Sequence, residues 1–266
     1  MTHQITIAVA TMDLGVTQYK LPSIALNNEV NLLIAHQISS AYTNHNFEDA
    51  YNKIKNQVAN ATIISSHELG LSKSRNLAID HCDTKYIVFS DDDNTYIEQF
   101  SSTIKKYQSQ LNDPEFISFQ IHDKNGIPFK DYSDQLKTHT NVSAMRISSI
   151  ENIVNCDFLK KHNIYFDESF GLGAKYPSCE QPIFLAQLLK AGAQAYYVPE
   201  PLAIHPKEHS GLDFYTQNNA QTRGQMFIKV FGAIKGRILA CVFMIKKIKE
   251  VPPGMRATFI KGVLGL

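Results

Sequence analysis

Short apolar runs separated by helical patterns dominate the first half of the chain. Residues 71–81 repeat their apolar side chains at helical spacing and lie between two such runs. Continuously apolar strands that alternate with helices are typical of a mostly parallel sheet covered on both faces. We therefore expect an α/β fold. The apolar runs predict strands over 5–11, 30–36, 61–65, 86–90 and 116–121.

The second half of the chain has one strong helical signal. Residues 181–191 carry Pro182 in the first turn, where a missing N–H costs nothing, and Gly192 just beyond the end. Weaker patterns predict a helix over 96–111, a polar loop over 126–140, a strand over 141–148 and two short strands over 195–198 and 202–204, separated by Pro199 and Pro201.

Composition bounds the class of protein. The chain has 266 residues, 44% hydrophobic and 19% charged, which excludes disorder and fibrous repeats and allows one large or two small domains. Its four cysteines form no C-x-x-C pair, which favours a reduced, cytoplasmic compartment. The N-terminal residues lack a signal-peptide pattern, and the longest fully apolar run, 238–245, is shorter than the roughly 20 residues of a spanning helix. We expect a cytoplasmic protein that does not cross a bilayer.

Charge divides the chain at residue 223. From Arg223 onward nine basic residues stand against one acidic residue, Glu250, which gives the tail +8 and leaves −7 for the rest. We therefore expect a domain over 1–222 and a basic, amphipathic helical extension over 223–266. Apolar residues alternate with lysines over 226–248, which fits either a helix lying on an anionic membrane or one packed on the sheet. The acidic body and the few aromatic residues of the tail argue against nucleic acid.

Three successive carboxylates follow the apolar run that ends at Phe89. Asp91, Asp92 and Asp93 would repel one another unless a cation or solvent balances them. Because residues two apart in an extended segment point the same way, Asp91 and Asp93 would share one site while Asp92 faces elsewhere. Mg²⁺ or Mn²⁺ suits two carboxylates together with phosphate oxygens. An acidic turn that caps the next helix is the alternative.

The segment upstream of these carboxylates carries a longer motif. Residues 70–78 read Gly-Leu-Ser-Lys-Ser-Arg-Asn-Leu-Ala and are followed by a strand and the aspartates. This order resembles the family 2 glycosyltransferases of the GT-A fold, with their G-x-[SA]-x-[SA]-R-N-x-[GA] segment and D-x-D-type motif. The resemblance extends over about residues 4–210 through residues 166–173, 179–181, 197–200 and 205. It implies a mostly parallel central sheet flanked by helices, and no P-loop, Rossmann or serine-hydrolase motif competes with it.

The resemblance also implies roles for individual residues. Asp93 would hold the Mn²⁺ or Mg²⁺ ion that bridges the donor diphosphate, and His205 would complete the metal site, with His209 as a competitor. Gly173 belongs to a glycine loop that lets the backbone approach the donor, although a plain tight turn is the other interpretation. The residues implied to contact the nucleotide-sugar are Thr11, Gln37, Arg75, Asp91, Asp92 and Gly173.

The base that deprotonates the acceptor falls in a Glu180-Gln181 pair, where the family carries an E-D motif. Glutamine cannot take a proton, so we expect Glu180 to be the catalytic base. Simple stabilisation of a helix N-terminus is the other interpretation of Glu180.

The function that the resemblance implies is a metal-dependent, inverting transfer of a sugar from a UDP-sugar to an acceptor hydroxyl. The acceptor would be a lipid-linked glycan in bacterial capsule or O-antigen assembly, with the tail on the inner face of the plasma membrane. A nucleotidyltransferase is an alternative, but residues 12–20 contain one Gly and one Lys where such enzymes carry a Gly- and Lys/Arg-rich loop. A non-catalytic, nucleotide-sugar-binding relative is the other, and Gln181 keeps it open.

Overall fold

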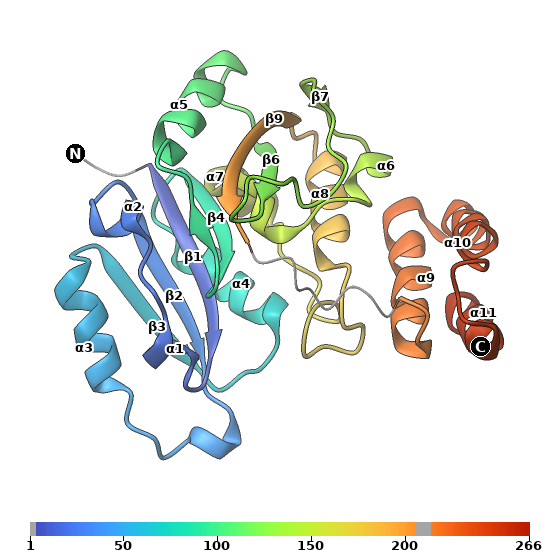
Figure 1. The fold of residues 1–266 in the computed structure, drawn as a ribbon, viewed down its shortest axis with the longest axis horizontal. Helices are drawn as coiled ribbons and strands as arrows, with labels where there is room; N and C mark the ends of the chain where they lie inside the picture. The colour runs from blue at the N-terminus through green and yellow to red at the C-terminus, as the bar shows by residue number, and fades with distance from the viewer. Residues whose placement is uncertain (1–3, 206–213) are drawn as a thin grey trace.

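A nine-stranded sheet forms the centre of the computed structural model, which describes residues 4–205 and 214–266 (Figure 1). Its strands are β1 (Ile5–Met12), β2 (Asn31–Gln37), β3 (Ala61–Ser66), β4 (Tyr86–Asp91), β5 (Thr95–Tyr96), β6 (Phe116–His122), β7 (Lys137–Thr138), β8 (Asn152–Asn155) and β9 (Ala195–Ile204). The spatial order is β3-β2-β1-β4-β8-β6-β9-β5, and β7 pairs with β9.

Most of the long strands run in one direction. β1 pairs in parallel with β2 and β4, β2 pairs in parallel with β3, and β6 pairs in parallel with β9, whereas β8 is antiparallel to β4 and β6. The mostly parallel α/β sheet expected from the sequence is thus confirmed. The register sets Ala10 beside Asp91 and Met12 beside Gln37, so the ends of β1, β2 and β4 share one edge.

Helices cover both faces of this sheet because successive strand residues point to opposite sides. Ile7 and Val9 of β1 join one core cluster with α1, α2, α3 and α5, while Ala8 joins a second with α4, α7 and α8. These helices and the short α6 are α1 (Gly15–Gln18), α2 (Ser23–Leu26), α3 (Glu48–Gln57), α4 (Leu71–His81), α5 (Phe100–Gln110), α6 (Asn141–Ala144), α7 (Cys156–His162) and α8 (Glu180–Lys190).

The strand expected over 141–148 is wrong. Residues 141–144 form α6, because the side chain of Thr140 accepts a hydrogen bond from the backbone N–H of Ser143 and the Ser143 hydroxyl accepts one from the backbone N–H of Thr140. This reciprocal cap satisfies N–H groups that would otherwise be free and favours a helical turn. The strand that pairs with β4 in this region is β8, which begins at Asn152.

Two further boundaries differ from the sequence expectation. β9 is one continuous strand through Pro199 and Pro201, and its register with β6 shifts on either side of Gln120, so irregular pairing accommodates the prolines. The helix expected from residue 96 begins at Phe100, because Thr95 and Tyr96 pair with the end of β9 as β5.

Three C-terminal helices pack beside the sheet domain. They are α9 (Gln217–Phe231), α10 (Ala233–Lys247) and α11 (Arg256–Leu264), and α9 lies between the sheet domain and the other two (Figure 1). The continuous helical segment expected over 226–248 is broken at Gly232, whose φ of 81° is strained for any other residue. α9 passes without a break through residues 222 and 223, so the change of charge falls inside a helix.

Contacts across α9 join the C-terminal helices to the sheet domain. Met226 packs with Phe170 and Ile183, and Nζ of Lys229 lies 2.7 Å from Oδ2 of Asp167. The same helix packs against α10 and α11 around the fully buried Ala220 and Phe259. None of the described helices has the length and apolar character needed to cross a bilayer.

Helix packing in this C-terminal unit depends on glycine. A Cβ atom on Gly224 of α9 would stand 2.3 Å from the carbonyl oxygen of Val263 in α11. We expect Gly224→Ala to lower the free energy of unfolding by about 1–3 kcal/mol, since the two helices would have to separate. Urea denaturation measures this loss. Gly254→Ala is the matched control because its Cβ would meet no atom within 4 Å; equal losses in both variants would contradict the expectation.

Candidate active site

The candidate site lies at the edge where β1 and β4 end. The Thr11 hydroxyl at the end of β1 donates a 2.7 Å hydrogen bond to Oδ2 of Asp92, just beyond β4. Gly15 stands against this pair, because a Cβ there would lie 2.5 Å from the Thr11 hydroxyl oxygen and 3.0 Å from Asp92. Thr11 and Asp92 therefore hold the two strand ends together.

Asp91 and Asp93 point away from that contact. Oδ1 of Asp91 lies 3.5 Å from Nη2 of Arg75, and Oδ1 of Asp93 lies 3.4 Å from Nε2 of His205. Asp92 faces Thr11 instead. β4 ends at Asp91, and Asp92 and Asp93 lie in the turn that follows, so this turn separates their side chains, not the two-residue period expected of an extended segment. Both outward carboxylates are accessible, with 41% of the Asp91 side chain and 55% of the Asp93 side chain exposed.

Arg75 links three elements from a buried position. Only 3% of its side chain is exposed, and its guanidinium donates at 2.8 Å to Oε1 of Glu180 and at 2.7 Å to the hydroxyl of Ser149. The guanidinium carbon also lies 5.5 Å from the centre of the Phe166 ring. The second turn of α4 thus places one fixed positive charge between the carboxylates of β4 and α8.

The segment after β8 and α7 is tied to the same helix. Nδ2 of Asn76 donates to the carbonyl oxygen of Phe166 at 3.0 Å, and the backbone N–H of Phe166 donates back to Oδ1 of Asn76 at 2.8 Å. The Ser72 hydroxyl donates to the carbonyl of Phe170 at 2.6 Å. Gly171 follows at φ 103°, where a Cβ would lie 2.9 Å from that hydroxyl oxygen. These contacts close the segment 166–171 against α4.

Gly173 and Gln37 both contact the loop that precedes α4. Gly173 has φ 81°, and a Cβ there would approach the Cα of Gly70 to 3.4 Å. The side-chain amide of Gln37 is hydrogen-bonded to the loop before α4. Its Nε2 donates to the carbonyls of Glu68 and Gly70, and its Oε1 accepts from the Gly70 N–H. In this structure Gln37 therefore positions that loop.

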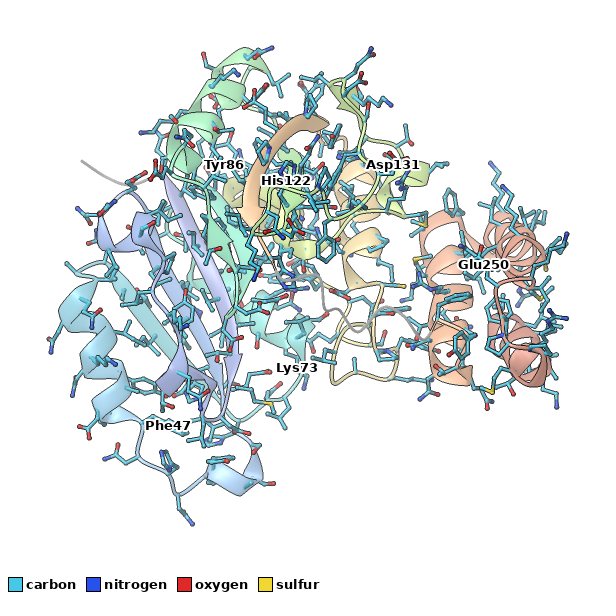
Figure 2. All side chains as sticks on the ribbon, viewed as in Figure 1. Phe47, Lys73, Tyr86, His122, Asp131 and Glu250 are labelled. Carbon is cyan, nitrogen blue, oxygen red and sulfur yellow. The ribbon has the colours of Figure 1, made fainter. Side chains whose placement is uncertain are left out.

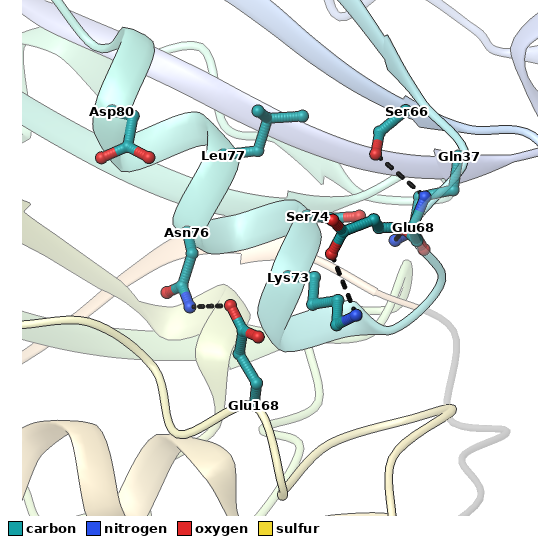
Figure 3. A pocket seen from close by; sticks show the side chains of 9 residues that line it. All are labelled: Gln37, Ser66, Glu68, Lys73, Ser74, Asn76, Leu77, Asp80 and Glu168. Carbon is teal, nitrogen blue, oxygen red and sulfur yellow. Dashed lines mark hydrogen bonds and ion pairs between the residues drawn. The ribbon is translucent and has the colours of Figure 1, made fainter.

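A cavity of about 220 Å³ opens beside Gln37 and runs along α4 (Figure 3). Its lining includes the ion pair of Lys73 with Glu68 at 3.0 Å and the hydrogen bond from Asn76 to Glu168 at 3.1 Å. Asp91, Asp93 and His205 do not line it. The cavity and the carboxylate edge are thus two separate features on either side of the motif that includes Arg75.

Glu180 and Gln181 open α8 and differ in their surroundings. The Glu180 side chain is 13% exposed. It forms an ion pair with Arg75, which also forms an ion pair with Asp91. Gln181 is 2% exposed, and neither its amide oxygen nor its amide nitrogen has a hydrogen-bond partner. Buried amides are nearly always paired, so these two atoms stand out in the site. Cys179, just before them, adopts a left-handed φ of 70°.

The side chains at this edge form only part of a metal site. Across 4–205 and 214–266, no three or more His, Cys, Asp or Glu side chains are arranged to hold an ion. Asp93 and His205 form a pair, and His209 lies outside the described residues. Mg²⁺ at phosphate sites takes one or two carboxylates and completes its shell with phosphate oxygens and water. The pair therefore fits an ion that arrives with a diphosphate, and it does not fit a self-contained metal centre.

The electrostatics of Asp91 reflect this crowding. Desolvation raises the pKa of its carboxyl above the ordinary range, and the negative charges of Asp93 and Glu180 act in the same direction. The guanidinium of Arg75 and His205 act in the opposite direction. A cation bound at this edge would stabilise the ionised carboxylate and so lower the pKa of Asp91.

Three residues of the site were not assigned from the sequence. Ser149 bonds Arg75 from a 3₁₀ turn before β8, and its sequence surroundings carry no motif. Asn76 directly follows Arg75 in the motif, which was a usable signal, and it holds the Phe166 backbone. Gly15 follows β1, and the need for a glycine there becomes clear only from the structure, where Thr11 and Asp92 leave no room for a Cβ atom.

Comparison with known proteins agrees with this geometry. Residues 41–166, just under half of the chain, match the family model described as Glycosyl transferase family 2. No curated protein matches the sequence. Among solved structures, TarS from S. aureus superposes with a TM-score of 0.63 at 15% identity over 97% of this chain, which spans 48% of the TarS chain.

Two related structures contain ligands. The 1–349 fragment of S. aureus TarS in complex with UDP-GlcNAc gives a TM-score of 0.67 at 15% identity, over 98% of this chain and 81% of that one. The mannosyltransferase PcManGT from Pyrobaculum calidifontis, in complex with GDP-Man and Mn²⁺, gives 0.57 at 12% identity, over 97% and 79%. The chain has the GT-A fold that these glycosyltransferases share. Its matched segment is that of family 2.

Removal of the Arg75 charge should destabilise the protein. Arg75→Met leaves the carboxylate of Glu180 largely buried without a counter-charge, so we expect a loss of about 3 kcal/mol in the free energy of unfolding. Urea denaturation measures the loss. The double variant Arg75→Met/Glu180→Gln should recover part of it, because the uncompensated charge is gone. Equal losses in the single and double variants would show that the ion pair is not the cause.

Proposed function

We propose that this protein transfers a sugar from a UDP-sugar to an acceptor hydroxyl with inversion. The main support is a group of four side chains at the edge where parallel strands end: Arg75 pairs with Asp91, and His205 pairs with Asp93. Open α/β sheets bind their ligands at this edge. UDP-GlcNAc and UDP in complexes of the TarS fragment support the choice of nucleotide.

In this proposal Asp93 and His205 hold a Mn²⁺ or Mg²⁺ ion with the donor diphosphate. When bound, the ion neutralises the charge that grows on the departing nucleoside diphosphate. Asp91 and Arg75 sit beside this position, and the fixed positive charge of Arg75 is shared by the carboxylates of Asp91 and Glu180. Thr11 and Asp92 hold the end of β1 against β4, while Gly173 belongs to the backbone loop on the donor side. Gln37 supports the loop before α4.

Glu180 is the base of this proposal. Its carboxylate would take the acceptor proton while the acceptor oxygen bonds to the sugar carbon and the bond from that carbon to the phosphate oxygen breaks. Oε1 accepts a hydrogen bond from Arg75, which orients the carboxylate. Gln181 beside it cannot take a proton, yet its unpartnered amide would bind a polar group of the acceptor.

The acceptor in this proposal is a lipid-linked glycan, as in bacterial capsule or O-antigen assembly, and the protein works on the inner face of the plasma membrane. Support comes from the basic C-terminal helices, which would face anionic lipid. A non-catalytic nucleotide-sugar-binding relative is the second candidate, because Gln181 stands where the family carries its acidic base. Metal-dependent nucleotide binding without turnover would favour that candidate.

Asp93→Ala should abolish turnover and nucleotide-dependent stabilisation. In the wild-type protein we expect UDP with Mn²⁺ to raise the melting temperature, since a ligand of the native state stabilises it by mass action, and GDP, CMP and ADP to raise it less. Thermal shift and release of UDP from UDP-sugars measure the two effects. The exposed Asp134→Ala is the matched control and should behave as wild type. Retained turnover in Asp93→Ala would remove the assigned metal role.

Glu180→Gln should lower kcat by a factor of about 10²–10⁴ while KM for the donor stays near the wild-type value. The amide keeps an acceptor for Arg75 but cannot take a proton. Steady-state kinetics with saturating donor separate the two constants. Glu200→Gln serves as control, because Glu200 binds Lys106 and Tyr107 away from the site. A parallel rise in KM and fall in melting temperature would instead indicate a purely structural carboxylate.

A further inference from the structure

The outer side of α10 exposes an apolar stripe. Ile234, Ile238, Val242 and Ile245 follow one another at helical spacing, and between 42% and 79% of each is exposed. Large apolar residues are normally scattered singly on a protein surface. Four on one face of one helix therefore need a covering partner.

The rotation of α10 is fixed by its opposite side. Gly236 and Ala240 are buried against α9, and a Cβ on Gly236 would lie 2.4 Å from the carbonyl oxygen of Phe227. This close approach leaves no room for the helix to turn its isoleucines inward. The apolar stripe thus faces away from α9, at the end of the molecule farthest from β3 (Figure 1).

Basic residues flank the stripe on both sides. At 3.6 residues per turn, Lys235 and Lys246 lie beside one margin of the isoleucines and Arg237 beside the other, and all three are exposed. Glu250, the lone acidic residue from position 223 onward, lies in this unit and pairs with Lys247 at 2.7 Å (Figure 2). The face therefore combines apolar side chains with net positive charge.

These features select the covering partner. A second copy of the chain would place the same positive margins against each other, and like charges in contact oppose association. An anionic bilayer offers acyl chains to the isoleucines and phosphates to the lysines and arginine. We propose that the outer face of α10 lies in the interface of an anionic membrane. This inference rests on the membrane location proposed above and names its surface, but it does not depend on the residues of the candidate active site.

Lipid vesicles test the proposal directly. Full-length protein should sediment with vesicles that contain 30% phosphatidylserine or phosphatidylglycerol, and much less with neutral phosphatidylcholine vesicles. Ile234→Gln/Ile238→Gln should weaken the binding at least tenfold, since two apolar side chains lose their burial. Lys235→Gln/Lys246→Gln should weaken it about twentyfold at low salt and have less effect as salt rises.

Matched controls lie on the sheet domain. Val142 is 71% exposed and Lys124 is exposed as well, so Val142→Gln and Lys124→Gln test a loss of the same groups elsewhere. All variants should keep the wild-type melting temperature and UDP-dependent thermal shift, which separates this proposal from the function of the site. Wild-type protein that ignores anionic vesicles would overturn the proposal. So would a wild-type dimer that the isoleucine double variant converts to a monomer, because a second copy would then cover the face.

Discussion

A single buried guanidinium organises the candidate site. From the second turn of α4, Arg75 reaches Glu180 in α8, Asp91 in β4 and Ser149 before β8. Without its charge, the carboxylates of Asp91 and Glu180 would lose the cation that they share, and the loss would be costly for the largely buried Glu180. The carboxylates at the sheet edge and the start of α8 can therefore approach one another only because α4 delivers Arg75 between them.

The sheet was predictable from the sequence for a simple reason. Buried parallel strands must be apolar on both faces, and this leaves continuous runs such as 86–90 that few other structures share. The hydrogen-bonded caps of short helices were harder to predict from the sequence. Thr140 and Ser143 form a helical turn where the apolar pattern suggested a strand, because a hydrogen-bonded cap outweighed weak side-chain periodicity. Pro199 and Pro201 predicted a break between two strands, but β9 is continuous. Its irregular pairing with β6 accommodates residues that have no N–H group to donate.

Some of the residues singled out in the sequence meet in the structure: Arg75 lies beside Asp91 and Glu180, and Asp93 lies beside His205. Their contacts were not predictable. The motif around Arg75 and the aspartates identified the elements that meet, and the register of β1, β2 and β4 then explains why they meet. The spacing of a motif carries no information on partners that are distant in sequence. Ser149 lies 74 residues from Arg75, and the Gln37 amide binds a loop more than 30 residues away. The roles of the individual residues in binding and turnover remain predictions.

The segment between Phe166 and Glu180 touches both halves of the molecule. One end is bound to α4 through Asn76 and Ser72, while Asp167 and Phe170 contact Lys229 and Met226 of α9. The sheet edge is thereby held at a fixed height from the outer face of α10. In the membrane-bound state proposed above, this frame would fix the distance between the lipid surface and Glu180. Only an acceptor whose reactive end stands at that height above the lipid would reach Glu180, so the position of α9 would set the length of glycan that is extended.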